Sequence, residues 1–383
     1  MTTECILSCP YHGQDGAVLC GPACAMMALG SLGIPPNGLS QSDLYDKIQP
    51  LKQDSSWWSD PYGLSQILNQ ILRHHEGGTY AFHSLESIES LTLHILETLI
   101  NTKRPCLIPI YSTRHWSVIY GATLDAPPSQ PGSYSVDGFW LNIPVETSAT
   151  QHGPGDDCER SADHQFFVPF SEFYSSYIQE YACKATEYLM RYIVLSSDRT
   201  PTLPAPRMPK ALFPRTRPPG LPVSLPQILK RARQVLAQRS WPWQQPASLQ
   251  PVRLRRPLVV ERLDQAGVFY ALVPVACDGQ VRALLVQDAH DGTLLGHHPL
   301  STPRRHLFPS LARVLAGALP SLQGPLSEAL TGDAAQAAAL VWKPCPQSWS
   351  PTLPFWHIHT PQGPLYLRVD GRVFSALTSE RSG

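Results

Sequence analysis

A run without a single acidic residue divides this chain of 383 residues into two halves of opposite charge. Residues 1–198 contain 9 Lys and Arg against 21 Asp and Glu, whereas residues 199–383 contain 21 against 9. Between Arg199 and Val260 there are twelve cations and no acid, and the first part of that run holds nine prolines. Proline fixes its backbone and lacks an N–H donor, so this part is expected to be an extended linker. We therefore expect two domains, 1–198 and 227–383, joined by a basic linker over 199–226.

The composition places further bounds on the chain. With 43% hydrophobic residues it can bury two ordinary cores. No window approaches the about 18 uninterrupted apolar residues of a membrane-spanning helix, and Met1–Cys5 lacks the cationic and apolar regions of a secretory signal. Nine cysteines without regular spacing fit a reducing compartment better than a disulfide framework. These features predict a cytoplasmic protein with no membrane partner.

Cys20 carries the clearest chemical signal in the sequence. It opens a run of small, apolar residues that predicts a helix to Gly30. Unpaired N–H groups and the dipole at a helix N-terminus favour a thiolate, which is the nucleophilic form of cysteine. Gln14, six residues upstream, can donate its side-chain amide to an oxyanion that forms beside the sulfur. We predict Cys20 as a catalytic nucleophile and Gln14 as an oxyanion donor, with Cys24 as a buried core residue.

A candidate base lies about a hundred residues downstream. His115 begins a segment rich in β-branched and aromatic residues, so its imidazole is expected at the start of a strand. A further strand ends at Asn142, whose side chain can orient the imidazole in a Cys-His-Asn arrangement. Asp137 and Asp125 are alternatives for that third role. The strands expected in this region are 104–111, 115–121 and 133–141.

These residues resemble a known family. Gln14, Cys20-Gly21, the segment His115–Gly121 and Asn142-Ile143-Pro144 are similar to motifs of the papain-like double-glycine (bacteriocin-processing) peptidases and of related soluble cysteine peptidases. The resemblance covers about residues 1–198. It implies an α+β fold with a helical part and an antiparallel sheet, and thiol-protease activity that needs no cofactor. The family's third residue is usually Asp followed directly by Pro, whereas here Ile143 separates Asn142 from Pro144.

The second half is expected to be a smaller α+β domain with a twisted antiparallel sheet. Asp-Gly pairs between short apolar runs predict hairpin turns, and Leu272–Gly296 faintly resembles the hairpins of PepSY-type, cystatin-like domains. An amphipathic helix is expected to bury Ile228, Leu229, Val235 and Leu236. The expected strands are 268–276, 281–287, 355–360, 365–369 and 373–374, and the expected helices are 224–238 and 308–319.

Other functions share some of these features. The same Cys-His order serves transglutaminases, amidases and acyltransferases, which differ in the acyl acceptor. A binding or scaffold protein with a degenerate site is a second alternative. Cys5, Cys9 and His12 have the spacing of metal ligands, but a fourth ligand at matching spacing is missing apart from the loose pair Cys158 and His164, so no metal is predicted.

The predicted partner is a peptide or protein substrate. The charge split also predicts that basic 199–383 docks on acidic 1–198, where it regulates the enzyme or recruits its substrate. Alternatively the basic half grips an acidic peptide, a partner protein or nucleic acid. Nucleic acid is disfavoured because the cations alternate with proline rather than with stacking aromatic residues.

Overall fold

A computed structural model of the protein divides into two units, Met1–Arg215 and Thr216–Ser382, which are called here the first and second unit. Most of the expected helix 308–319, the pair Cys158 and His164, and part of the expected linker lie outside the described residues. The structure describes residues 2–34, 38–73, 79–111, 114–145, 165–178, 192–209, 222–238, 252–305, 308, 311, 338–345, 347–360 and 363–378.

The first unit is built around one long strand, β4 (His115–Leu124), whose ten residues are all buried. Every pairing between its strands is antiparallel, and their order is β6-β5-β4-β3-β7-β2 with β1 added on β4. The expected strands at 104–111, 115–121 and 133–141 are confirmed by β3, β4 and β5. The bounds are β1 Thr3–Ile6, β2 Tyr80–Leu85, β3 Cys106–Ile110, β5 Val136–Asn142, β6 Gln165–Pro169 and β7 Tyr192–Ser197.

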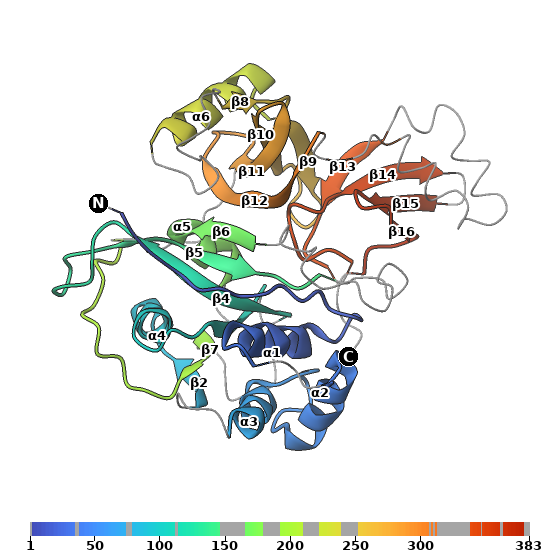
Figure 1. Ribbon diagram of the computed structural model, residues 1–383. Helices are drawn as coiled ribbons and strands as arrows, with labels where there is room; N and C mark the ends of the chain where they lie inside the picture. Colours follow the sequence, from blue (N-terminus) through green and yellow to red (C-terminus); the bar gives the residue numbers. More distant parts are fainter. Residues whose placement is uncertain are drawn as a thin grey trace. The chain divides into compact units, whose positions relative to one another are not determined.

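Four helices of ordinary length cover this sheet or one another. α1 (Cys20–Ser31) packs against β4 and α4 (Ile88–Ile100) against β7 (Figure 1). Polar residues fix where the other helices begin: Ser40 forms a capping box with Asp43, and Asp60 accepts the N–H of Gly63. The remaining helical bounds are α2 Gln41–Ile48, η1 Gln49–Leu51, α3 Pro61–Leu72, α5 Phe170–Glu172 and the π-helical turn η3 Phe173–Tyr177.

Residues 199–209, the start of the expected linker, lie along the first unit. The backbone N–H of Thr202 donates to Glu97, and Gly132 donates its N–H to Ala205. The Arg207 guanidinium bonds the Asp125 carboxylate at 2.7 Å. A basic segment therefore does contact an acidic residue of 1–198, while docking of the rest of 199–383 stays a prediction.

The second unit is a strand-rich layer with one described helix. Its strand order is β16-β15-β14-β13-β9-β10-β11-β12, with β8 added on β10. The hairpin expected at 268–287 is confirmed by β10 and β11, and its turn residues Asp278 and Gly279 both have positive φ. The bounds are β8 Arg253–Leu254, β9 Leu258–Arg262, β10 Phe269–Cys277, β11 Gln280–Asp288, β12 Leu294–Arg304, β13 Ala339–Trp342, β14 Phe355–Thr360, β15 Gly363–Arg368 and β16 Val373–Phe374.

α6 (Leu225–Ala237) packs on β10 and β11 and contributes two residues to a buried cluster of the second unit (Figure 1). Ile228 and Ala232 are fully buried against side chains of β10 and β11 that include Val273 and Leu285. Leu229, Val235 and Leu236 pack at the margin of the same cluster. The expected amphipathic helix and its buried face are thus confirmed.

The expected fold class is wrong. A papain-like helical part with an antiparallel sheet, followed by a smaller α+β domain, does not describe a chain whose described residues form sixteen strands and six α-helices. The sheet is also mixed, because β9 and β13 run parallel. The error arose because the motif residues that carried the resemblance are local and do not determine how many strands a sheet contains. Several strands, among them β1, β2, β6 and β7, are short runs whose period is ambiguous in sequence.

No helix in the described part of the chain is long and apolar enough to cross a membrane.

A pair of histidines makes the first unit sensitive to acid. His94 on α4 lies against His83 on β2, with ring centroids 4.2 Å apart. Burial lowers the pKa of His94 to about 4, and His83 lowers it further against an opposing effect of Glu97. The unfolded chain titrates near 6.5, so it binds the extra proton first as the pH falls. The stabilisation is therefore complete above pH 6.5 and is lost between about pH 6.5 and 4.

Replacing His94 tests this assignment. The half-buried position of His94 reduces the effect through solvent screening. From pH 7 to pH 5 the free energy of unfolding should decrease in both proteins. We expect the decrease to be about 1 kcal/mol smaller in His94→Gln than in the wild type. Urea denaturation at the two pH values measures the difference. Equal losses in both proteins would contradict the prediction.

Candidate active site

Cys20 is the first residue of α1, as the sequence predicted. The helix begins after Leu19, and no acidic residue stands in its first turn. The N-terminal N–H groups of a helix have no partner within the helix, and together with the dipole they favour an anion there. The Cys20 side chain keeps 9% of its surface accessible, whereas Cys24 one turn later is fully buried as predicted.

The packing of Gly21 brings Cys20 and His115 to the same corner of the first unit. A Cβ on Gly21 would stand 3.5 Å from the Trp116 ring and only 2.6 Å from the Cβ of Ser59. Gly21 directly follows Cys20 in the sequence, and Trp116 directly follows His115. The start of α1 therefore lies beside the Trp116 ring at the start of β4, and the contact that leaves no room for a Cβ on Gly21 is with the side chain of Ser59.

His115 is buried, and a backbone carbonyl fixes its orientation. Its Nε2 lies 2.8 Å from the carbonyl oxygen of Pro144. A carbonyl only accepts hydrogen bonds, so Nε2 carries the proton and Nδ1 carries the lone pair of the neutral ring. Burial lowers the pKa of His115 to about 3, against a smaller opposing effect of the Pro144 hydrogen bond. The imidazole is therefore neutral near pH 7, and Nδ1 is its basic nitrogen.

The segment 143–145, which supplies that carbonyl, is held from two sides by the N-terminal part of the chain. The Tyr11 hydroxyl donates to the carbonyl of Ile143 at 3.2 Å and accepts the N–H of Val145 at 2.9 Å. The backbone N–H of Gln14 donates to the Val145 carbonyl at 2.9 Å. We call these contacts the Tyr11 clamp. It places Gln14, fully buried, beside the residues that orient His115.

Of the three residues considered for the third role, Asn142 lies near the His115 end of β4, and the two aspartates lie near the other end. Asn142 is buried at the end of β5, where its Nδ2 donates to the carbonyl of Cys9 at 3.3 Å. Asp125 follows the opposite end of β4, about 30 Å of strand from His115, and binds Ser135 and Arg207. Asp137 is exposed near that same end. Among the described contacts, the partner on the Nε2 side of His115 is the Pro144 carbonyl.

The loop at residues 57–60 forms one wall of this corner. Trp57 is buried with its ring centroid 5.9 Å from that of Trp116, and the Trp116 indole N–H donates to the carbonyl of Ser59. Trp58, by contrast, is 48% exposed. Trp57 and Trp116 thus pack in the core, and Trp58 presents its ring to solvent.

Sequence reasoning missed the Tyr11 clamp and the role of Pro144. Tyr11 stands three residues before Gln14, but its partners are 132 and 134 residues away, so no local pattern points to them. Backbone carbonyls carry no residue-type signal at all. Ser59 was missed because its role depends on a contact between distant segments: its side chain fills the place that a Cβ on Gly21 would need.

Cys5 and Cys9, which were considered as metal ligands in the sequence, form hydrogen bonds with backbone carbonyls instead. The Cys5 thiol donates to the carbonyl of Leu99 and the Cys9 thiol to that of Met27. Burial lowers the pKa of His12 and raises those of both thiols. Within the described ranges, no three side chains of the metal-binding types gather into a site.

The contact between Gly21 and Ser59 gives a test of the corner. Gly21→Ala would place a methyl group 2.6 Å from the Ser59 Cβ, which forces the loop at 57–60 to move. We expect a loss of about 1–3 kcal/mol in the free energy of unfolding, as for other overpacked sites. Ser59→Gly removes both close atoms, so the double variant should recover most of that loss. Additive effects in a double-mutant cycle would contradict the contact.

Comparison with protein-family models, with curated proteins and with solved structures found no match to this chain. The assignment of the site therefore depends on its residues and geometry, and the resemblance to double-glycine peptidases stays a prediction carried by the motif residues.

Proposed function

We propose that this chain is a cysteine peptidase whose nucleophile is Cys20 and whose general base is His115. The observation that carries the proposal is the hydrogen bond from Nε2 of His115 to the Pro144 carbonyl. It leaves Nδ1 as the basic nitrogen of a rigidly held ring, at the same corner as a cysteine that opens a helix. A carbonyl in this position performs the orienting role of the third residue in a Cys-His-Asn site.

In the first step, the Cys20 sulfur attacks the carbonyl carbon of a peptide bond while Nδ1 of His115 takes the thiol proton. Burial favours the neutral form of His115, which is the form that can accept this proton. The resulting oxyanion is stabilised by the side-chain amide of Gln14 and by backbone N–H groups at the start of α1. The tetrahedral intermediate then collapses, the C–N bond breaks, and His115 returns its proton to the leaving amine.

In the second step, water replaces the amine. His115 takes a proton from the water as it attacks the thioester, and the Cys20 sulfur leaves and recovers that proton. The products are an amine and a carboxylic acid, and the enzyme is restored without a cofactor. Transfer of the acyl group to another amine would use the same first step, so the mass of the products distinguishes hydrolysis from acyl transfer.

The surroundings of the site favour a neutral or basic peptide. Residues 1–198 carry 21 acidic against 9 basic residues, which attracts cationic substrates. Trp58, next to the loop residue that contacts Gly21, offers an exposed aromatic ring for an apolar side chain of the substrate. We place the enzyme in the cytoplasm, because the seven cysteines described in the structure are free thiols.

Substitution of the nucleophile tests the proposed function. Incubation with a peptide library, followed by mass spectrometry, should show fragments whose formation requires Cys20. Turnover by Cys20→Ser should fall at least about a thousandfold with an unchanged melting temperature, because the nucleophile is lost and the fold is kept. A peptidyl ketone electrophile should label the wild type at Cys20.

Cys24→Ser is the matched control for that experiment. Cys24 lies one turn along the same helix and is fully buried, so its removal should preserve both cleavage and labelling. Cleavage that persists in Cys20→Ser, or labelling that follows Cys24 instead, would refute the proposal.

The Tyr11 clamp gives a second test. Tyr11→Phe removes the hydroxyl that brackets Pro144, which costs about 1–2 kcal/mol of stability and loosens the orientation of His115. We expect kcat to fall about tenfold or more with little change in KM, since Tyr11 acts through His115 and not on the substrate. Tyr120→Phe is the control, because the buried Tyr120 hydroxyl forms no hydrogen bond with any described residue. Equal kinetics in the two variants would rule out a positioning role for Tyr11.

A further inference from the structure

The second unit contains a slot where two neighbouring strands separate. Within the described residues, the parallel ladder between β9 and β13 consists of two pairs, Val341 with Glu261 and Trp342 with Arg262. Before that point along both strands lies a cavity of about 470 Å³, a size typical of ligand sites. Leu258 and Val259 of β9 line one side, and Ala339 and Leu340 of β13 line the other. The cavity therefore occupies the place where further strand pairing would otherwise continue.

One edge of β9 and one edge of β13 face this slot. The opposite edge of β9 is paired with β10 from Leu258 onward, and the opposite edge of β13 is paired with β14 through Ala339 and Leu340. A strand edge presents alternating N–H and C=O groups, which an added extended chain can pair with. The slot thus offers two backbone edges together with apolar side walls.

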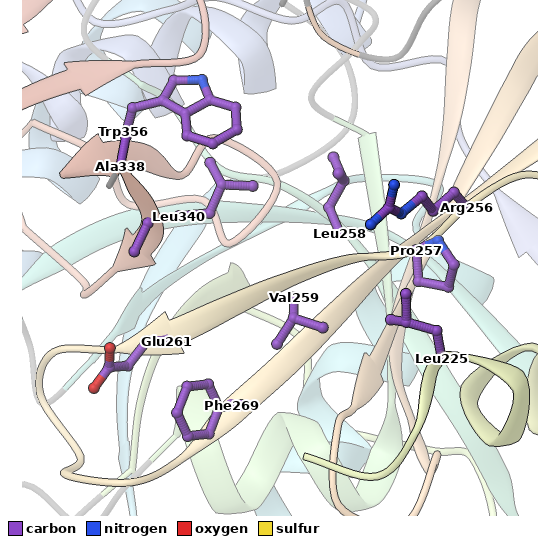
Figure 2. Close-up of a pocket in the computed structure, with 11 residues that line it drawn as sticks. Leu225, Arg256, Pro257, Leu258, Val259, Glu261, Phe269, Ala338, Leu340 and Trp356 are labelled. Atoms are coloured by element: carbon purple, nitrogen blue, oxygen red, sulfur yellow. The ribbon is translucent and has the colours of Figure 1, made fainter. Parts of the chain in front are cut away.

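Two opposite charges mark the ends of the slot. Figure 2 shows Arg256 and Glu261 on opposite sides of the lining, with Leu258, Val259 and Leu340 between them. Four residues lie between the two charged positions, so five steps of extended chain span about 16 Å. Arg256 is exposed and forms no ion pair with the described residues. A small apolar ligand would use neither the charged ends nor the strand edges.

We propose that this slot binds an extended peptide segment of about five residues, with apolar side chains in its centre, a carboxylate at the Arg256 end and a cation at the Glu261 end. The segment adds as a strand between β9 and β13, so its backbone supplies hydrogen bonds and its side chains supply selectivity. The site lies within the second unit and does not depend on the proposed peptidase activity.

Binding of defined peptides to the full chain tests this proposal. The probe is fluorescein-labelled Asp-Val-Ile-Val-Lys, and fluorescence anisotropy measures its dissociation constant. Two matched peptides separate the contributions: Gln-Val-Ile-Val-Gln lacks the charged ends, and an N-methylated form of the probe lacks donors on its central backbone. We expect each of these two peptides to bind at least tenfold more weakly than the probe.

Variants of the protein complete the test. Arg256→Gln should weaken the binding of the probe, but less than loss of both charged ends does, because the contact with Glu261 is kept. It should leave the binding of the uncharged peptide unchanged. Arg253→Gln, an exposed neighbour outside the slot lining, should change neither. The same constants should be found in Cys20→Ser, in which the probe cannot be cleaved by the proposed nucleophile. No binding of the probe, equal binding of all three peptides, or equal effects of the two arginine variants would overturn the proposal.

Discussion

The complete burial of β4 is the constraint on which the first unit depends. A strand whose ten residues are all buried needs neighbours at both edges and cover on both faces. β1 and β3 share one edge, β5 takes part of the other, and α1 packs on a face. His115 stands at the first position of this strand, so the pairing that buries the core also fixes the imidazole. Precision at the site is thus a consequence of burial in the sheet.

Much of the local structure could be predicted from the sequence, because it depends on short-range patterns. The helix that starts at Cys20, the strand that starts at His115, the 268–287 hairpin and the buried face of α6 all follow from spacing and turn residues. The fold class could not be predicted in this way. Sheet size depends on whether short segments such as β1 and β7 find partners far along the chain, and a four- or six-residue apolar run does not encode that.

The same distinction holds for the candidate site: some of its residues could be predicted from the sequence and others could not. Cys20, His115 and Gln14 are candidates because their residue types carry chemistry. The structure places His115 and Gln14 against the segment 143–145, and it places Gly21, which follows Cys20, against the Trp116 ring. The orienting group is a backbone carbonyl, and the residue that steadies it is a tyrosine with distant partners. Neither has a signature in sequence. The slot between β9 and β13 is equally invisible there, since it results from a ladder that stops after two pairs.

The Tyr11 clamp also determines when the site can exist. Tyr11 and Val145 are 134 residues apart, and contacts of such separation form late because a long loop must close first. During synthesis, the helix that bears Cys20 emerges well before the strand that bears His115, and the orienting carbonyl follows both. A growing chain therefore holds a thiol without a positioned base. The orientation of His115 is thus a property of the closed core and not of any local segment.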